Sequence, residues 1–128
     1  MNKLEERIDM KSNGLKKSKS LRRLLMSSAH ININKELSGK IGINPTILLS
    51  ELLSRMDYFE SQNLLEEGDW FYNSVENLKQ GTTLSEYEQR MGVKILVRFD
   101  LIECKIKHMP HKRYFRIKEE NIFELMDL

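Results

Sequence analysis

Cysteine and long apolar runs are scarce in this sequence, and each scarcity excludes a class of protein. The single cysteine, Cys104, cannot form an internal disulfide, which excludes a disulfide-stapled secreted domain and fits a reducing cytosol. The longest apolar runs, such as residues 47–49, fall far below the roughly 20 residues that a membrane helix needs. The basic N-terminus carries no apolar core of signal-peptide length. We therefore expect a cytoplasmic protein with no membrane partner.

Glycine and proline are also few, with six and two among 128 residues, which argues against a low-complexity linker chain. What is present is ordinary for a globular protein: 40% hydrophobic and 31% charged residues. A chain of this length fits one domain and can bury roughly two thirds of its unfolded surface. We predict a basic N-terminal arm over residues 1–29, partly helical or flexible, followed by one domain over residues 30–128.

Charge is sorted along the chain although the net charge is only +2. The first acid-free basic stretch holds Lys11, Lys16, Lys17, Lys19, Arg22 and Arg23. The second holds Lys105, Lys107, Lys112, Arg113, Arg116 and Lys118. Between them, residues 44–80 carry seven acids against two basic residues. Such sorting can present a basic face to phosphates, and solvated charge with no partner is the alternative.

Helix signals dominate the middle of the sequence. Residues 30–34 alternate polar and apolar, as in a short strand or extended segment, and residues 35–41 predict one or two helical turns. Asn44 as N-cap and Pro45 at the first helical position predict a helix through about Ser61. Its acids are expected to form a solvated face. The aromatic residues 69–73 predict a short strand.

Two further helices are predicted on either side of a tight turn at residues 80–83. Ser74 caps the first, over about residues 75–79, and Ser85 caps the second, which runs to about Phe99. Ser85 and Glu88 have the spacing of a capping box. Val93, Leu96 and Phe99 follow the three-residue spacing of a buried stripe.

Two alternating runs end the pattern and predict a β-hairpin. The first places Ile102, Cys104 and Ile106 on one face, and the second places Arg113, Phe115 and Ile117 on one face, with residues 108–111 as the turn. Residues 119–128 suggest a closing helix. The predicted fold class is α+β, mainly helical: a winged helix-turn-helix with a three-stranded antiparallel sheet and additional N- and C-terminal helical segments.

The sequence resembles a known family at several segments. These are Trp70-Phe71-Tyr72, Leu84-Ser85-Glu86-Tyr87-Glu88-Gln89-Arg90, Phe99-Asp100-Leu101-Ile102-Glu103 and Met109-Pro110-His111-Lys112-Arg113-Tyr114-Phe115-Arg116-Ile117. Over about residues 33–122 the chain is similar to the winged-helix modules of phage and plasmid replication proteins in Gram-positive bacteria, which are related to the N-terminal part of DnaD-like primosomal proteins. The resemblance implies a stand-alone DNA-binding protein, encoded by a phage or mobile element, that acts in replication initiation or transcription regulation.

In this interpretation the helix that begins after Ser85 enters the major groove of double-stranded DNA. Its candidate contacts are Ser85, Glu86, Tyr87, Gln89, Arg90, Lys94 and Arg98. The candidate wing contacts are Lys107, His108, His111, Lys112 and Arg113. The candidate contacts of the N-terminal arm are Lys16, Lys17, Lys19, Arg22 and Arg23. Glu86 and Glu88 count against DNA contact by this helix, because carboxylates repel phosphate unless they cap the helix or read cytosine.

An alternative function rests on Met91 and Ile95, which lie one turn apart on the predicted groove-facing helix. They form a candidate protein interface, as in a phage-encoded inhibitor or adaptor of a host factor. Further candidate partners are a second copy of the chain and a host replication or defence protein. We predict no enzyme, no cofactor and no metal: Cys104, His108 and His111 lack a fourth ligand at a convincing spacing, and no catalytic motif is present.

Overall fold

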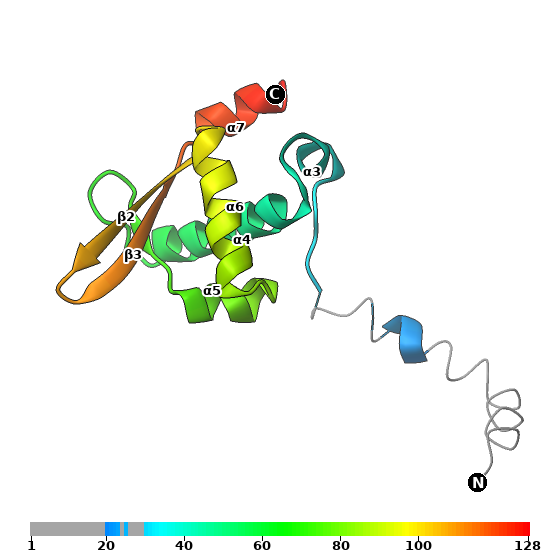
Figure 1. Ribbon diagram of the computed structural model, residues 1–128, viewed down its shortest axis with the longest axis horizontal. Coiled ribbons are helices and arrows are strands. Elements are labelled where there is room, and N and C mark those ends of the chain that lie inside the picture. The colour runs from blue at the N-terminus through cyan, green and yellow to red at the C-terminus, as the bar shows by residue number, and fades with distance from the viewer. Residues whose placement is uncertain (1–19, 24, 26–29) are drawn as a thin grey trace, which may run out of the picture. The chain divides into compact units, whose positions relative to one another are not determined.

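The computed structural model describes residues 20–23, 25 and 30–128, and its compact folded unit is Asn32–Leu128 (Figure 1). Three of the predicted arm contacts, Lys16, Lys17 and Lys19, lie outside the described residues. Arg22 and Arg23 lie in a helical segment over residues 20–23 and are exposed. Within the described part of the chain, no helix is both long and apolar enough to cross a membrane.

The folded unit begins with two consecutive helices, α3 (Lys35–Ile41) and α4 (Ile43–Ser61). The side chain of Asn34 caps α3 by accepting a hydrogen bond from the Leu37 amide at 2.9 Å. Gly42, with φ of +98°, separates the two helices. The prediction that Asn44 caps α4 was therefore wrong by two residues, because the glycine turn already starts the helix. Residues 31–34 are extended and form no described strand.

The short strand β1 (Phe71–Tyr72) is followed by two helices, α5 (Val75–Thr82) and α6 (Glu86–Arg98). Ser74 caps α5 as predicted, but α5 extends through residues 80–82, the first three of the four that were predicted to form the turn. The Thr82 hydroxyl donates to the Leu78 carbonyl within the helix, and the chain turns only at Thr83, with φ of +64°. The predicted capping box between Ser85 and Glu88 is confirmed.

A β-hairpin follows, made of β2 (Ile102–His108) and β3 (His111–Ile117), and α7 (Glu119–Leu125) follows it. β3 lies in the centre of an antiparallel sheet of order β1-β3-β2, with Phe71 opposite Phe115 and His108 opposite His111. The predicted hairpin is confirmed. The folded unit is thus α+β, mainly helical, with a three-stranded antiparallel sheet.

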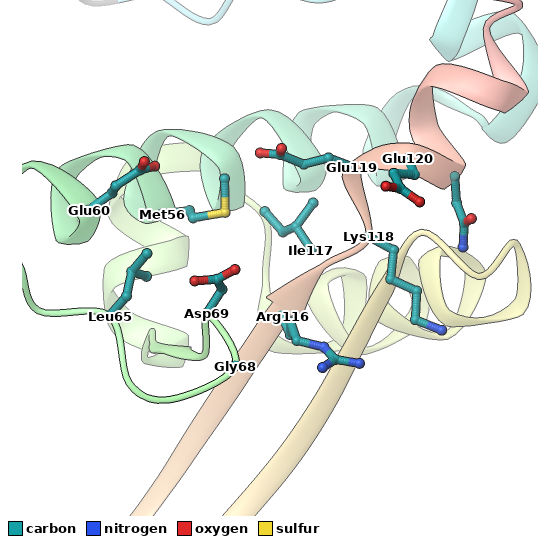
Figure 2. Close-up of a pocket in the computed structure, with 11 residues that line it drawn as sticks. Met56, Glu60, Leu65, Gly68, Asp69, Arg116, Ile117, Lys118, Glu119 and Glu120 are labelled. Carbon is teal, nitrogen blue, oxygen red and sulfur yellow. The ribbon is translucent and has the colours of Figure 1, made fainter.

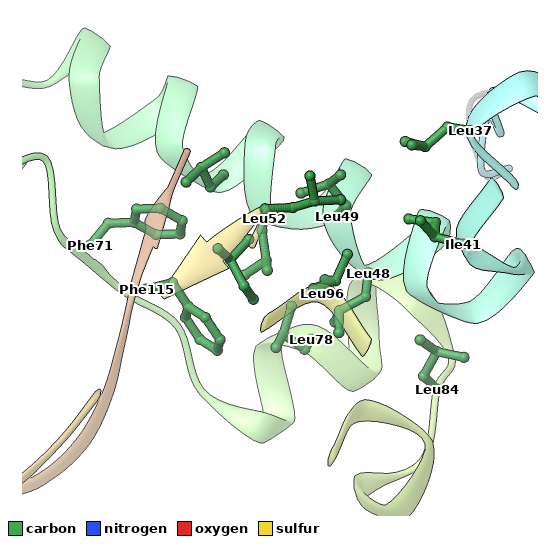
Figure 3. Packing of buried hydrophobic residues seen from close by; sticks show 13 residues of the cluster. Leu37, Ile41, Leu48, Leu49, Leu52, Phe71, Leu78, Leu84, Leu96 and Phe115 are labelled. Carbon is green, nitrogen blue, oxygen red and sulfur yellow. The ribbon is translucent and has the colours of Figure 1, made fainter. Parts of the chain in front are cut away.

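The core lies between the helices and the inner face of the sheet (Figure 3). Its fully buried members are Leu48, Leu49, Leu52, Phe71, Leu78, Leu96 and Phe115. The predicted stripe on α6 is confirmed at Leu96 and wrong at Phe99, which is 42% exposed. Phe99 is the C-cap of α6, where the chain leaves the helical path, and Leu101 takes the inward position instead.

Candidate nucleic-acid interface

Three cations form a row on the solvent side of α6. Arg90, Lys94 and Arg98 recur every four residues, which puts successive side chains about 6 Å apart along the helix axis. All three are exposed, and none forms a salt bridge with another described residue. Tyr87 shares this side, is 61% exposed, and lies with its ring centroid 5.4 Å from the Arg90 guanidinium carbon. We call the three cations, together with Tyr87, the α6 cation row.

The two carboxylates at the start of α6 differ in what they can do. Glu88 faces back into the helix terminus: its Oε1 accepts from the Ser85 amide at 3.0 Å, and its Oε2 accepts from the Asn44 side chain at 3.3 Å. The hydrogen bond from the Ser85 backbone, followed by that from the Ser85 side chain, holds the pKa of Glu88 below its ordinary value. The hydroxyl oxygen of Ser85 in turn accepts a hydrogen bond from the Glu88 amide at 3.1 Å. Glu86 is exposed and remains beside the row.

Gln89 does not belong to this surface, which corrects the prediction that it contacts bases. Its side chain is fully buried. Its Nε2 donates to the carbonyls of Val75 at 3.0 Å and Leu84 at 3.1 Å, and its Oε1 accepts from Arg113 at 3.1 Å. With all its hydrogen bonds directed inward, Gln89 fixes α6 to α5 and to the hairpin. Its spacing of three and seven residues from Gly92 and Leu96 was the sequence signal for a buried position.

Arg113, a predicted wing contact, is half-buried and points inward, which does not favour contact with phosphate. It shares the inner face of β3 with Phe115, whose ring centroid lies 5.1 Å from the guanidinium carbon. One guanidinium nitrogen donates to Gln89. Burial lowers the pKa of Arg113 from its ordinary value. The residue connects the base of the hairpin with α6.

The other predicted wing residues lie at or near the hairpin tip. His108 and His111 are exposed and opposite each other, with ring centroids 5.7 Å apart. Lys107 forms a salt bridge with Glu66 at 3.2 Å, whereas Lys112 has no such partner among the described residues. The hairpin tip therefore carries less uncompensated charge than the sequence predicts.

The outer face of the sheet carries a second group of basic side chains, of which the sequence predicted only Lys107 and Lys112 as contacts. We call this group, with the rings that its cations contact, the outer sheet face. Its members are Trp70, Tyr72, Lys105, Lys107, Lys112, Tyr114 and Arg116. Alternation along β2 and β3 was the available signal, since Lys105 and Lys107 alternate with apolar residues. The contribution of Trp70 and Tyr72 could not be read from the sequence, because it depends on how β1 and the preceding loop meet the hairpin.

Two cavities of the folded unit each share a residue with these surfaces: Tyr87 lines one, and Arg116 lines the other. One, of about 460 Å³, is an apolar groove between the α3–α4 junction and α6. It is lined by Ile41, Gly42, Ile43, Asn44, Pro45, Tyr87, Glu88, Met91, Gly92 and Ile95. The other, of about 630 Å³, has Met56, Leu65 and Ile117 among its walls and a rim that includes Glu60 and Glu119 (Figure 2). The predicted pair Met91 and Ile95 thus belongs to the first groove, where Met91 is 38% exposed.

Metal and nucleophile chemistry have little support in the described part of the chain. No group of three or more His, Cys, Asp or Glu side chains there could hold a metal ion. Burial raises the pKa of the Cys104 thiol, which disfavours the reactive thiolate. Comparisons with protein-family models, with curated proteins and with solved structures each found no match.

Proposed function

We propose that this chain is a winged-helix protein that binds double-stranded DNA, with α5 and α6 as the helix-turn-helix and the β2–β3 hairpin as the wing. The order of elements supports this assignment: helix, short strand, two helices around a tight turn, then a hairpin whose second strand pairs with the short strand. The resemblance to phage and plasmid replication modules favours a role in replication initiation or transcription regulation.

The α6 cation row is the observation that carries the proposal. Exposed cations without acidic partners cost little to bring against phosphates, because no existing salt bridge has to break. Of the two acids that count against DNA contact, Glu88 is engaged in capping α6, and only Glu86 remains exposed. In this proposal Arg90 and Tyr87, in the first turns of α6, contact base edges, and Lys94 and Arg98 contact phosphates.

Fluorescence anisotropy with a labelled random duplex tests the proposal. We expect binding at low salt that weakens by orders of magnitude between about 50 and 200 mM salt, as for a protein with several phosphate contacts. The double variant Lys94→Gln with Arg98→Gln should weaken duplex binding by about tenfold or more.

The matched control is Lys35→Gln with Lys40→Gln, which removes the same charge from exposed positions on α3. Equal losses in the two double variants would show that only net charge matters. Absence of duplex binding at low salt would refute the proposal.

A second candidate function is favoured by the apolar groove beside α6. Ile43 and Tyr87 line it and are 60% and 61% exposed, which is unusual for large apolar side chains at one cavity. A protein-interaction module, such as an inhibitor or adaptor of a host factor, would use this groove. Met91→Lys with Ile95→Lys should then abolish association with the partner or with a second copy while the fold persists. A double variant that loses no association and binds duplex better would exclude this function.

A further inference from the structure

We propose that the outer sheet face is a separate binding site for single-stranded nucleic acid. α4 and α6 pack on the other side of the sheet, where Phe71 and Phe115 are fully buried, so neither helix covers this face. Of its rings, Trp70 and Tyr72 are half-buried, and Tyr114 is buried beneath its neighbours, with 8% of its surface exposed. It does not include any member of the α6 cation row, so ligand binding at this face can be tested independently of DNA binding by α6.

Each aromatic ring of this face lies under at least one cation. The Nζ of Lys105 lies 3.9 Å from the ring centroid of Trp70, that of Lys107 lies 4.4 Å from Tyr114, and that of Lys112 lies 5.1 Å from Tyr72. These are cation–π distances. The rings of Tyr72 and Tyr114 are neighbours across the β1–β3 pair, with centroids 6.1 Å apart. Rings and ammonium groups are thus interleaved over all three strands.

The face is basic on balance. Two of its cations have acidic partners, since Lys107 pairs with Glu66 and Arg116 pairs with Glu103. Lys105 and Lys112 pair with no carboxylate among the described residues, and Lys105 is exposed on the edge strand β2. A polyanion can therefore bind here through two cations that lie over aromatic rings and form no salt bridge with a described residue.

The rings decide which polyanion fits. In a duplex the faces of the bases are stacked on one another, and a row of protein rings would have nothing to stack on. A single strand offers both phosphates and free base faces, and sites that combine a basic groove with aromatic platforms bind it with little sequence preference. Lysine side chains are flexible, so phosphates can draw the ammonium groups outward while bases take their place over Trp70 and Tyr72.

The sole tryptophan of the protein lies in this face and gives a local readout. We would titrate the full chain with oligothymidylate of about 16 nucleotides, the upper end of common single-strand site sizes, and follow both Trp70 emission and anisotropy. We expect saturable quenching of Trp70 in step with binding. Lys105→Glu should weaken oligothymidylate binding by about tenfold and weaken duplex binding less. Tyr72→Leu should weaken it with little change in salt dependence, because it removes stacking and no charge.

Lys40→Glu on α3 is the matched control, since it reverses an exposed charge far along the chain from the sheet. Oligouridylate in parallel shows whether the site prefers DNA or RNA through the 2′-hydroxyl. Oligothymidylate binding that leaves Trp70 emission unchanged, or equal losses in Lys105→Glu and Lys40→Glu, would overturn the proposal. Stronger quenching by phosphatidylserine vesicles than by oligothymidylate would assign the face to membranes instead. A protein that bound oligothymidylate in this way but bound no duplex would refute the proposed function of α6 and leave this site standing.

Discussion

Gln89 shows how much a single residue can change the interpretation of a helix. In the sequence it stands among Tyr87 and Arg90, and its amide suits adenine recognition. In the structure it lies on the opposite side of α6 and satisfies two carbonyls and one guanidinium. A buried polar side chain with all its hydrogen bonds made holds one arrangement of its neighbours, because any other arrangement leaves polar groups unpaired. Gln89 therefore positions the α6 cation row without belonging to it.

Replacing Gln89 with alanine should destabilise the protein by about 2–4 kcal/mol. The substitution leaves the Val75 and Leu84 carbonyls and Arg113 without their partner and opens a cavity in the interior. Arg90→Ala, one residue away but exposed, should change stability by no more than about 0.5 kcal/mol. Urea unfolding of both variants measures the contrast, and similar stabilities would mean that the hydrogen bonds of Gln89 are not formed in solution.

Glu88 predicts a dependence of stability on pH. Because hydrogen bonds from Ser85 and Asn44 lower its folded pKa below the ordinary 4.5, its contribution is present above that pH and is lost as pH falls through the folded pKa. Glu88→Gln keeps a residue that suits a capping box but cannot titrate. The thermal midpoint of the natural protein should therefore fall more steeply than that of the variant between about pH 6 and pH 3. If the thermal midpoints of the two proteins fell equally steeply, the capping hydrogen bonds would not lower the pKa of Glu88.

At the scale of elements, the sequence predicted most of the fold because its signals are local. The caps at Ser74 and Ser85, the hairpin alternation and the helix over residues 35–41 each depend on neighbouring residues, and all are confirmed. The errors arise where tertiary packing decides. Gly42 starts α4 ahead of Asn44, and Thr82 keeps α5 helical through a glycine because its side chain is buried. The candidate site was predicted less well, since the inward turn of Gln89 and Arg113 is a property of the packed sheet and helices.

Two helical glycines should respond oppositely to larger side chains. At Gly39 on α3 an added Cβ meets nothing within 4 Å, so Gly39→Ala should stabilise the protein by about 0.5–1 kcal/mol through helix propensity. At Gly92 on α6 an added Cβ lies 3.0 Å from the Leu48 side chain, at the buried crossing of α6 and α4. Gly92→Leu should therefore destabilise by about 1–3 kcal/mol or more. Chemical denaturation of the two variants provides the comparison, and a Gly92→Leu protein as stable as the natural one would contradict the close packing of these helices.

At the scale of the whole molecule, folding redistributes the charges that the sequence keeps apart. The second basic stretch contains no acid, yet three of its cations meet carboxylates in space: Lys107 meets Glu66, Arg116 meets Glu103, and Lys118 meets Asp100 and Glu103. The α6 cation row, by contrast, is preceded by acids in the sequence but is unpaired in the folded unit. Segment composition therefore overstates the unpaired positive charge of the hairpin and understates that of α6.

This redistribution predicts which cations control the salt dependence of duplex binding. Releasing counterions requires a cation that meets phosphate, and each such contact contributes about 0.9 to the slope of log K against log salt. Arg98→Gln should therefore lower the slope by about one. Lys118→Gln removes the same charge from a residue whose pKa is raised chiefly by its hydrogen bond to Asp100. Its loss should leave the slope unchanged, because that ammonium is already engaged by Asp100 and Glu103. If both substitutions lowered the slope equally, duplex DNA would contact Lys118 as well as Arg98, and α6 would not be the principal contact.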